Sequence, residues 1–150
     1  MKALAVDLGG SHAACAVVDG REVVAVETVS LEAARGLAGS LPAIVEALKR
    51  AASGAAVKVS DCAGLAFGFC GLVDAAGGRV LSTNAKYDDA PGLDLPRWCR
   101  ESFGLRFRIE NDARLALLGE RHAGAAQGTD DVVMMTLGTG IGGVAMIDGR

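Results

Sequence analysis

A chain of 150 residues, of which 51% are hydrophobic and only 4% aromatic, can bury one core built mainly from small aliphatic side chains. Its formal net charge of -3 excludes the basic surplus that proteins use to bind nucleic-acid backbones or anionic membranes. No segment reaches 18 apolar residues and no secretion signal is recognisable, so we expect a cytoplasmic protein without nucleic-acid or membrane partners.

The first thirty residues predict three antiparallel strands. Three β-prone runs are separated by Gly9-Gly10 and by Asp19-Gly20, and the second pair is a strong hairpin signal. The runs are residues 3–6, 12–18 and 22–29.

The middle of the chain alternates helix and strand. Residues 38–52 carry apolar side chains at helical spacing with charged residues on the other face, and they lead to a buried strand at 64–69. A loop-rich stretch rich in glycine follows, then a short helix at 95–103 and a strand at 105–109. This alternation predicts an α/β fold.

The last part of the chain predicts a helix and a hairpin. Residues 113–126 are rich in helix formers, and Asp112 stands where it can cap that helix. A strand at 132–137, a glycine turn and a strand at 144–147 follow. Because a two-stranded ribbon is marginal alone, we expect residues 1–112 to form one lobe and residues 113–150 to begin a second that this chain truncates.

Two glycine turns can expose backbone N–H groups to an anion. Asp7 precedes Gly9-Gly10 and would hold a hydrated Mg²⁺ against nucleotide phosphates, although a simple hairpin with Asp in its turn explains the same residues. The run 138–142, Gly-Thr-Gly-Ile-Gly, resembles a phosphate cradle more closely. It lacks the P-loop lysine and precedes a strand, which excludes an ordinary P-loop and argues against a Rossmann fingerprint.

One carboxylate is a candidate general base. Asp112 ends an apolar strand beside Asn111, an amide that can orient a hydroxyl, and cap and base are compatible roles. No lysine, cysteine or paired histidine is close in the sequence, so direct phosphoryl transfer to a hydroxyl is simpler than a covalent intermediate.

We expect most of the other polar or sulfur-containing residues to have structural roles. We expect His12 to flank the first phosphate turn, His122 to lie on an exposed helix face, and Met134-Met135 to lie in a strand core. Residues 86–89 predict a solvated loop, beside which Asn84 can reach a ligand. The scattered cysteines predict reduced structural thiols: Cys15, Cys62, Cys70 and Cys99.

Four motifs in order give the chain a resemblance to a known family. Together they resemble the ROK family of bacterial sugar kinases and sugar-responsive repressors, in the actin/hexokinase/Hsp70 ATPase superfamily, over essentially the whole chain. The motifs are Asp7-Leu-Gly-Gly-Ser-His with Asp19, Gly68-Phe-Cys-Gly-Leu-Val-Asp74, Glu110-Asn-Asp-Ala with Leu118-Gly-Glu, and Thr136-Leu-Gly-Thr-Gly-Ile-Gly-Gly.

The resemblance implies a fold and a site. The fold would be ribonuclease H-like, with a mixed five-stranded sheet and the start of a second such lobe. Asp112 would take the proton from a sugar hydroxyl, Asp7 would organise Mg-ATP, and the cytoplasmic full-length protein would be a homodimer. The implied sugar-binding residues are Gly71, Asn84, Asn111 and Asp112. The implied nucleotide-binding residues are Asp7, Gly9, Gly10, Ser11, His12, Gly138, Thr139, Gly140 and Gly142.

Several positions depart from the family pattern. Ser11 replaces the usual threonine but keeps its hydroxyl, and the Lys86-Tyr87 loop departs from the Asn-x-x-Trp pattern of glucokinase-like members. The family's downstream Glu-x-Gly-His sugar motif and cysteine-rich zinc site would follow Arg150. The remaining departures are Cys70 and Leu72, where Pro or small residues are common, and Val144, where a third glycine is frequent.

The sequence therefore predicts an ATP-dependent kinase for a hexose or an N-acylated amino sugar, without selecting the sugar. Two alternatives stay open: a non-catalytic sugar sensor or repressor of the same family, and a sugar-independent actin-like ATPase. Only six residues precede Asp7, which leaves no room in this chain for a repressor's helix-turn-helix module. The chain alone is expected to need the missing lobe for activity.

Overall fold

The computed structural model of the protein describes residues 1–83, 85–137 and 141–150. The chain divides into two compact units, Met1–Glu110 and Asn111–Arg150. In the described part of the chain, no helix is both long enough and apolar enough to cross a membrane.

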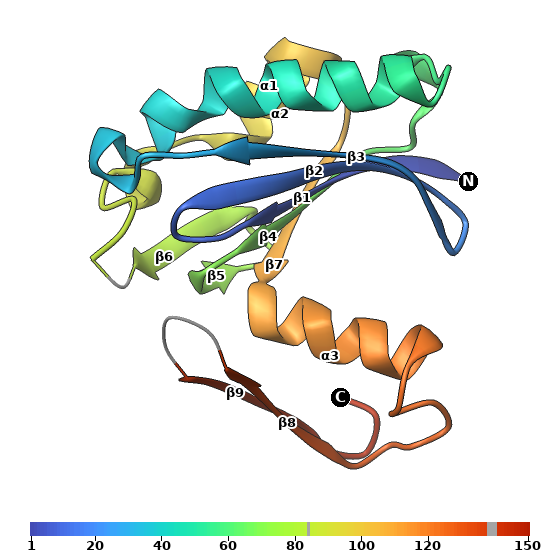
Figure 1. Ribbon diagram of the computed structural model, residues 1–150. Helices are drawn as coiled ribbons and strands as arrows, with labels where there is room; N and C mark the ends of the chain where they lie inside the picture. Colours follow the sequence, from blue (N-terminus) through green and yellow to red (C-terminus); the bar gives the residue numbers. More distant parts are fainter. Residues whose placement is uncertain (84, 138–140) are drawn as a thin grey trace. The chain divides into compact units, whose positions relative to one another are not determined.

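The first unit is built on a mixed five-stranded sheet with the order β3-β2-β1-β4-β7 (Figure 1). β1 pairs antiparallel with β2 and parallel with β4, and β2 pairs antiparallel with β3. The predicted mixed sheet is therefore confirmed. The strands are β1 (Lys2–Leu8), β2 (His12–Asp19), β3 (Glu22–Ser30), β4 (Leu65–Phe69) and β7 (Phe107–Asn111).

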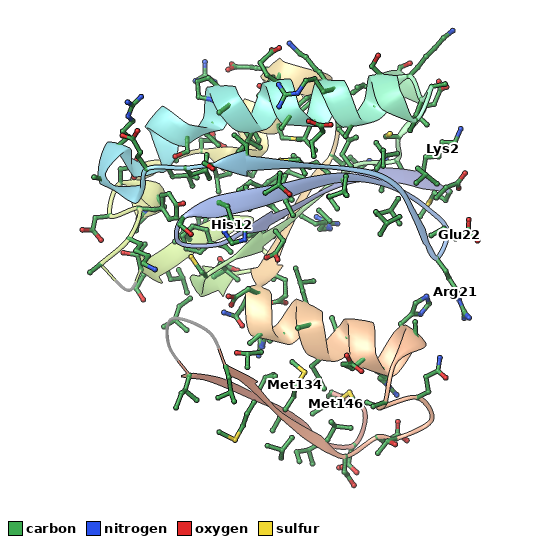
Figure 2. The ribbon with its side chains drawn as sticks, in the orientation of Figure 1. Lys2, His12, Arg21, Glu22, Met134 and Met146 are labelled. Carbon is green, nitrogen blue, oxygen red and sulfur yellow. The ribbon has the colours of Figure 1, made fainter. Side chains whose placement is uncertain are left out.

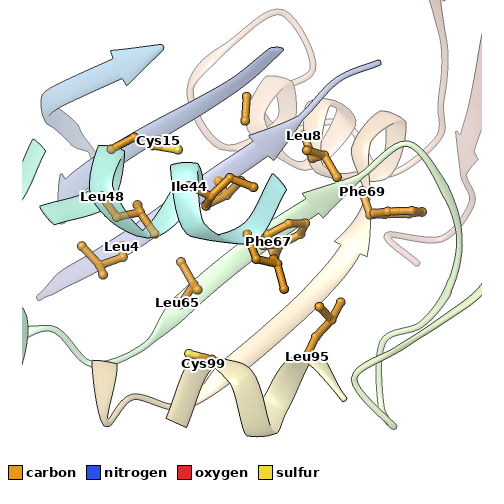
Figure 3. Close-up of a cluster of buried hydrophobic side chains, with 14 of the residues drawn as sticks. Leu4, Leu8, Cys15, Ile44, Leu48, Leu65, Phe67, Phe69, Leu95 and Cys99 are labelled. Atoms are coloured by element: carbon orange, nitrogen blue, oxygen red, sulfur yellow. The ribbon is translucent and has the colours of Figure 1, made fainter. Parts of the chain in front are cut away.

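Two helices cover one face of this sheet (Figure 1). α1 (Gly36–Gly54) packs its apolar stripe on β2 and β3, where Leu37, Ile44 and Leu48 are fully buried. α2 (Leu95–Phe103) packs on the same side, and Figure 3 shows how the two helices and the sheet enclose one aliphatic and aromatic core. Short 3-10 turns lie at Ala33–Arg35, Val59–Asp61 and Ala90–Gly92.

A second, small hairpin lies in the stretch for which the sequence predicts only loops. β5 (Gly71–Asp74) pairs antiparallel with β6 (Arg79–Thr83). Its turn is closed by the Gly77 N–H, which donates to Asp74 Oδ1 over 2.9 Å, and Gly78 has a φ of +68°. Strands of four and five residues between glycines give too little alternation to be recognised from sequence.

The second unit contains α3 (Asp112–Ala123) and the antiparallel ribbon of β8 (Val132–Leu137) and β9 (Ile141–Met146). Met146 is buried and Met134 half-buried, and Figure 2 shows both side chains on the α3-facing side of the ribbon. Met135 is 65% exposed, so the prediction of a core position is wrong for this residue. The strand alternation places neighbouring side chains on opposite faces.

Several element boundaries differ from the predicted ones. β7 extends through Asn111, α3 begins at Asp112 and ends at Ala123 rather than Ala126, and β9 begins at Ile141 rather than Val144. All four cysteines are free thiols, as predicted, and Cys15, Cys62 and Cys99 are buried.

Candidate functional site

The turn after β1 offers backbone donors to an anion. The Gly9 N–H donates to the His12 carbonyl over 2.9 Å and closes the turn. Among the residues that the structure describes, the N–H groups of Gly10 and Ser11 donate to no protein acceptor. Among the described residues, the backbone donors of this turn that could bind an anion are therefore those of Gly10 and Ser11, while the Gly9 donor closes the turn.

Three side chains surround this turn. Asp7 is an exposed residue near the end of β1, in register with Ala14 of β2 and Gly68 of β4. Ser11 Oγ lies 3.3 Å from Nδ1 of His12, the exposed first residue of β2, which Figure 2 labels beside the turn. The predicted nucleotide-binding residues of the first motif thus lie together at one end of the sheet.

Residues 85–92, which we term the 85–92 loop, pack against the same turn. Tyr87 is 1% exposed, and its hydroxyl donates to the Gly9 carbonyl over 2.9 Å. Burial, and to a smaller extent the nearby Cys70 thiol, raises the pKa of Tyr87, which keeps the phenol a proton donor. The prediction of a solvated loop is therefore wrong at Tyr87, because the ring packs against Phe69 with centroids 6.4 Å apart.

The far end of the 85–92 loop holds the start of α1. Asp89 accepts the N–H of Leu37 over 2.7 Å and that of Ala38 over 2.8 Å, one with each carboxylate oxygen. Gly36 has a φ of +71°, and a methyl group there would lie 2.6 Å from Asp89 Oδ1. A residue 52 positions away thus caps the helix, a contact that no local sequence pattern indicates.

One of the predicted sugar-binding residues of the first unit, Gly71, lies on the small hairpin. Gly71, the first residue of β5, is in register with Thr83, the last residue of β6. Asn84 follows Thr83 directly and lies outside the described residues. Gly71 also has a packing role, since a methyl group there would lie 2.6 Å from the Ser82 carbonyl oxygen and 2.7 Å from the Phe69 ring.

Asn111 and Asp112 make different hydrogen bonds at the start of α3. Asn111 is the N-cap of α3, because its Oδ1 accepts the Arg114 N–H over 3.2 Å, and so the prediction of Asp112 as the cap is wrong. The Asn111 amide donates to Asp112 Oδ1 over 3.0 Å, and the Ala113 N–H donates to the same oxygen over 2.9 Å. Among the described residues nothing donates to Asp112 Oδ2, so this oxygen can accept a further hydrogen bond.

The second glycine motif is described in part. Gly138, Thr139 and Gly140 lie outside the described residues. Gly142 lies in β9 opposite Thr136 rather than in the turn, and a methyl group on Gly142 would collide with Thr136 Oγ1. Close packing against Thr136 is therefore a structural reason for glycine at this position.

The described residues offer few protein ligands to a metal ion. The described residues contain no group of three or more His, Cys, Asp or Glu side chains able to hold a metal ion together. A single exposed carboxylate at Asp7 fits Mg²⁺ in the form it prefers, bound through one or two carboxylates, several waters and substrate phosphates.

Comparisons with known proteins identify the same family that the sequence motifs resemble. The family model of the ROK family matches residues 3–150. A crystal structure of a ROK hexokinase from Thermus thermophilus is 33% identical with a TM-score of 0.81, covering 100% of this chain and 48% of that one. A ROK family glucokinase from Streptomyces griseus, crystallised with glucose and AMPPNP, is 32% identical with a TM-score of 0.77, covering 100% of this chain and 46% of that one.

A further relative is named for a different sugar substrate. A beta-glucoside kinase of Listeria monocytogenes is 36% identical over 93 residues, which cover 61% of this chain and 31% of the relative. The chain spans about half the length of the solved relatives. The chain, with its mixed five-stranded sheet, has the actin-like ATPase fold of these kinases.

Proposed function

Because the chain belongs to the ROK family, we propose that it is the N-terminal part of an ATP-dependent kinase for a hexose or an N-acylated amino sugar. Asp112 carries this proposal, since one carboxylate oxygen is held by two donors and the other is open among the described residues. The named relatives, a hexokinase, a glucokinase and a beta-glucoside kinase, support a sugar hydroxyl as the acceptor.

In the proposed reaction Asp112 Oδ2 takes the proton of the sugar hydroxyl as the oxygen attacks the terminal phosphorus of ATP. The bond between that phosphorus and the bridging oxygen breaks, and ADP leaves with the electron pair. Asn111 and the start of α3 keep the carboxylate in one orientation, because they occupy Oδ1 and leave only Oδ2 for the proton.

The turn of the first motif would bind the phosphates in this scheme. The N–H groups of Gly10 and Ser11 would donate to phosphate oxygens, and the Ser11 hydroxyl would add a third donor. Mg²⁺, when bound, neutralises phosphate charge, and Asp7 is the residue that would hold it through water. Gly71 would contact the sugar from the small hairpin, and Asn84 is the second sugar-binding residue proposed in this unit.

A substrate panel tests the proposal. ADP release with Mg-ATP is followed for the full-length protein that carries this chain, with glucose, mannose, fructose, N-acetylglucosamine and N-acetylmannosamine as acceptors. We expect one of these sugars to stimulate ADP release and to yield one sugar phosphate per ADP. ADP release that no sugar changes would favour an actin-like ATPase, and sugar binding without ADP release would favour a sensor.

A further inference from the structure

The 85–92 loop brings a lysine to the first glycine turn. Tyr87 is anchored to Gly9 by its hydroxyl, and Asp89 is anchored to α1 by both carboxylate oxygens. Lys86 lies directly before the first anchor, so its backbone position relative to the turn is fixed by contacts on the C-terminal side of the loop.

The Lys86 side chain extends across Gly10. A methyl group on Gly10 would lie 2.9 Å from both Cδ and Cε of Lys86 and would collide with the ammonium group. Lys86 is half-buried, although lysine prefers full exposure. The absence of a side chain at Gly10 is what admits this lysine to the turn.

The Lys86 ammonium lacks a carboxylate partner in the part of the chain that the structure describes. Beside it, the N–H groups of Gly10 and Ser11 also donate to no protein acceptor among the described residues. A cation and two backbone donors that converge on one turn form a site for an anion with several oxygens, for which a phosphate group is the natural ligand.

The neighbourhood of the loop indicates which phosphate Lys86 contacts. The loop follows β6, whose last residue, Thr83, is in register with Gly71 on the sugar side of the proposed site. Lys86 follows Thr83 by three residues and extends its side chain across Gly10, so its loop connects the hairpin that carries Gly71 to the turn assigned to the nucleotide. The phosphate nearest the acceptor sugar is the one that is transferred.

We infer that Lys86 binds the terminal phosphoryl group of the nucleotide and neutralises its charge during transfer, with Tyr87 as its positioning residue. This inference rests on the proposed kinase function. It gives the protein a phosphate-binding lysine that the glycine turns themselves lack, delivered from a loop 76 residues further along the chain than Gly10.

The test compares Lys86→Met, which keeps the length of the stem and removes the charge, with Lys86→Arg and with Lys58→Met in the full-length protein. Lys58 is a matched control because it is exposed and precedes β4, whereas the turn lies at the opposite, C-terminal ends of β1 and β4. Circular dichroism and thermal midpoints verify that each variant is folded.

Two readouts separate phosphate binding from structure. Calorimetric affinity for Mg-AMPPNP should fall about 10- to 100-fold in Lys86→Met, while affinity for ADP stays within about twofold. Turnover with saturating sugar should fall about 100-fold, with partial recovery in Lys86→Arg. Lys58→Met should match the wild type in both measurements.

The outcomes distinguish this inference from the proposed function. A wild type that turns over sugar, with Lys86→Met indistinguishable from it, would refute the role of Lys86 and leave the kinase intact. A wild type without sugar-dependent turnover, in which Lys86→Met still selectively loses AMPPNP affinity, would support the lysine and refute the kinase. Equal loss of AMPPNP and ADP affinity, or no nucleotide binding by the wild type, would overturn the inference.

Discussion

The Asp89 cap of α1 makes a quantitative prediction about stability. Asp89→Ala removes the acceptor of two first-turn N–H groups, Leu37 at 2.7 Å and Ala38 at 2.8 Å. Loss of an N-cap acceptor costs about 1 kcal/mol, within a range of roughly 0.5–2, and loss of a negative charge at a helix N-terminus adds about 0.3–1 kcal/mol. The expected loss in free energy of unfolding is therefore about 1–3 kcal/mol.

Urea unfolding followed by circular dichroism measures this loss. With a slope of about 2 kcal/mol per molar urea, the midpoint should fall by roughly 0.5–1.5 M without a change in slope. Asp89→Asn keeps one acceptor and should give an intermediate value. Asp88→Asn is the matched control, because Asp88 is exposed and, among the described residues, accepts a side-chain hydrogen bond only from Thr83 Oγ1. Equal midpoints for Asp89→Ala and Asp88→Asn would refute the long-range cap.

Three further predictions follow from the described contacts. Gly36→Ala should destabilise the protein by more than about 1 kcal/mol in the same assay, because φ is +71° and the methyl group meets Asp89, whereas Gly54→Ala, with open space around it, should not destabilise it. Asn111→Ala should lower the free energy of unfolding by about 1 kcal/mol, because α3 loses its N-cap, and should lower turnover less than removal of Asp112 does. Wild-type stability together with wild-type turnover would contradict the role of Asn111. Burial raises the pKa of Cys15 and of Cys99 from 9.0 to about 11, so the folded state favours the neutral thiols. The stabilisation from the two buried neutral thiols is complete below about pH 9 and is lost as the pH rises toward 11. Unfolding curves across this range should therefore show a midpoint that falls with pH. This fall should be shallower in the Cys15→Ala variant.

The sequence predicts best where local signals agree. The range of α2 matches its predicted bounds because Asp94 caps it, Pro96 stands in its first turn and Gly104 ends it in the left-handed conformation. The Asp19-Gly20 hairpin is confirmed for a similar reason, since Gly20 has a φ of +63° in the turn between β2 and β3. In both elements the residue type and the backbone geometry specify each other.

Contacts between distant segments explain what the sequence could not reveal. The burial of Tyr87 depends on Gly9 and Phe69, and the cap of α1 comes from Asp89, so residues 86–89 look like a solvated loop when taken alone. Asn111 and Asp112 are both good cap residues, and only the length of β7 decides between them. The candidate base at Asp112 follows from sequence, whereas the orientation of its two oxygens required the structure.

The most direct test of the central claim measures sugar binding and phosphoryl transfer on one preparation of the Asp112→Asn variant of the full-length protein. General-base removal lowers rates by about 10²- to 10⁴-fold, and the substitution preserves the size of the side chain. We predict wild-type sugar affinity by calorimetry together with a loss of sugar phosphate formation of that size. Wild-type turnover in a folded variant would contradict the assignment of Asp112 as the base.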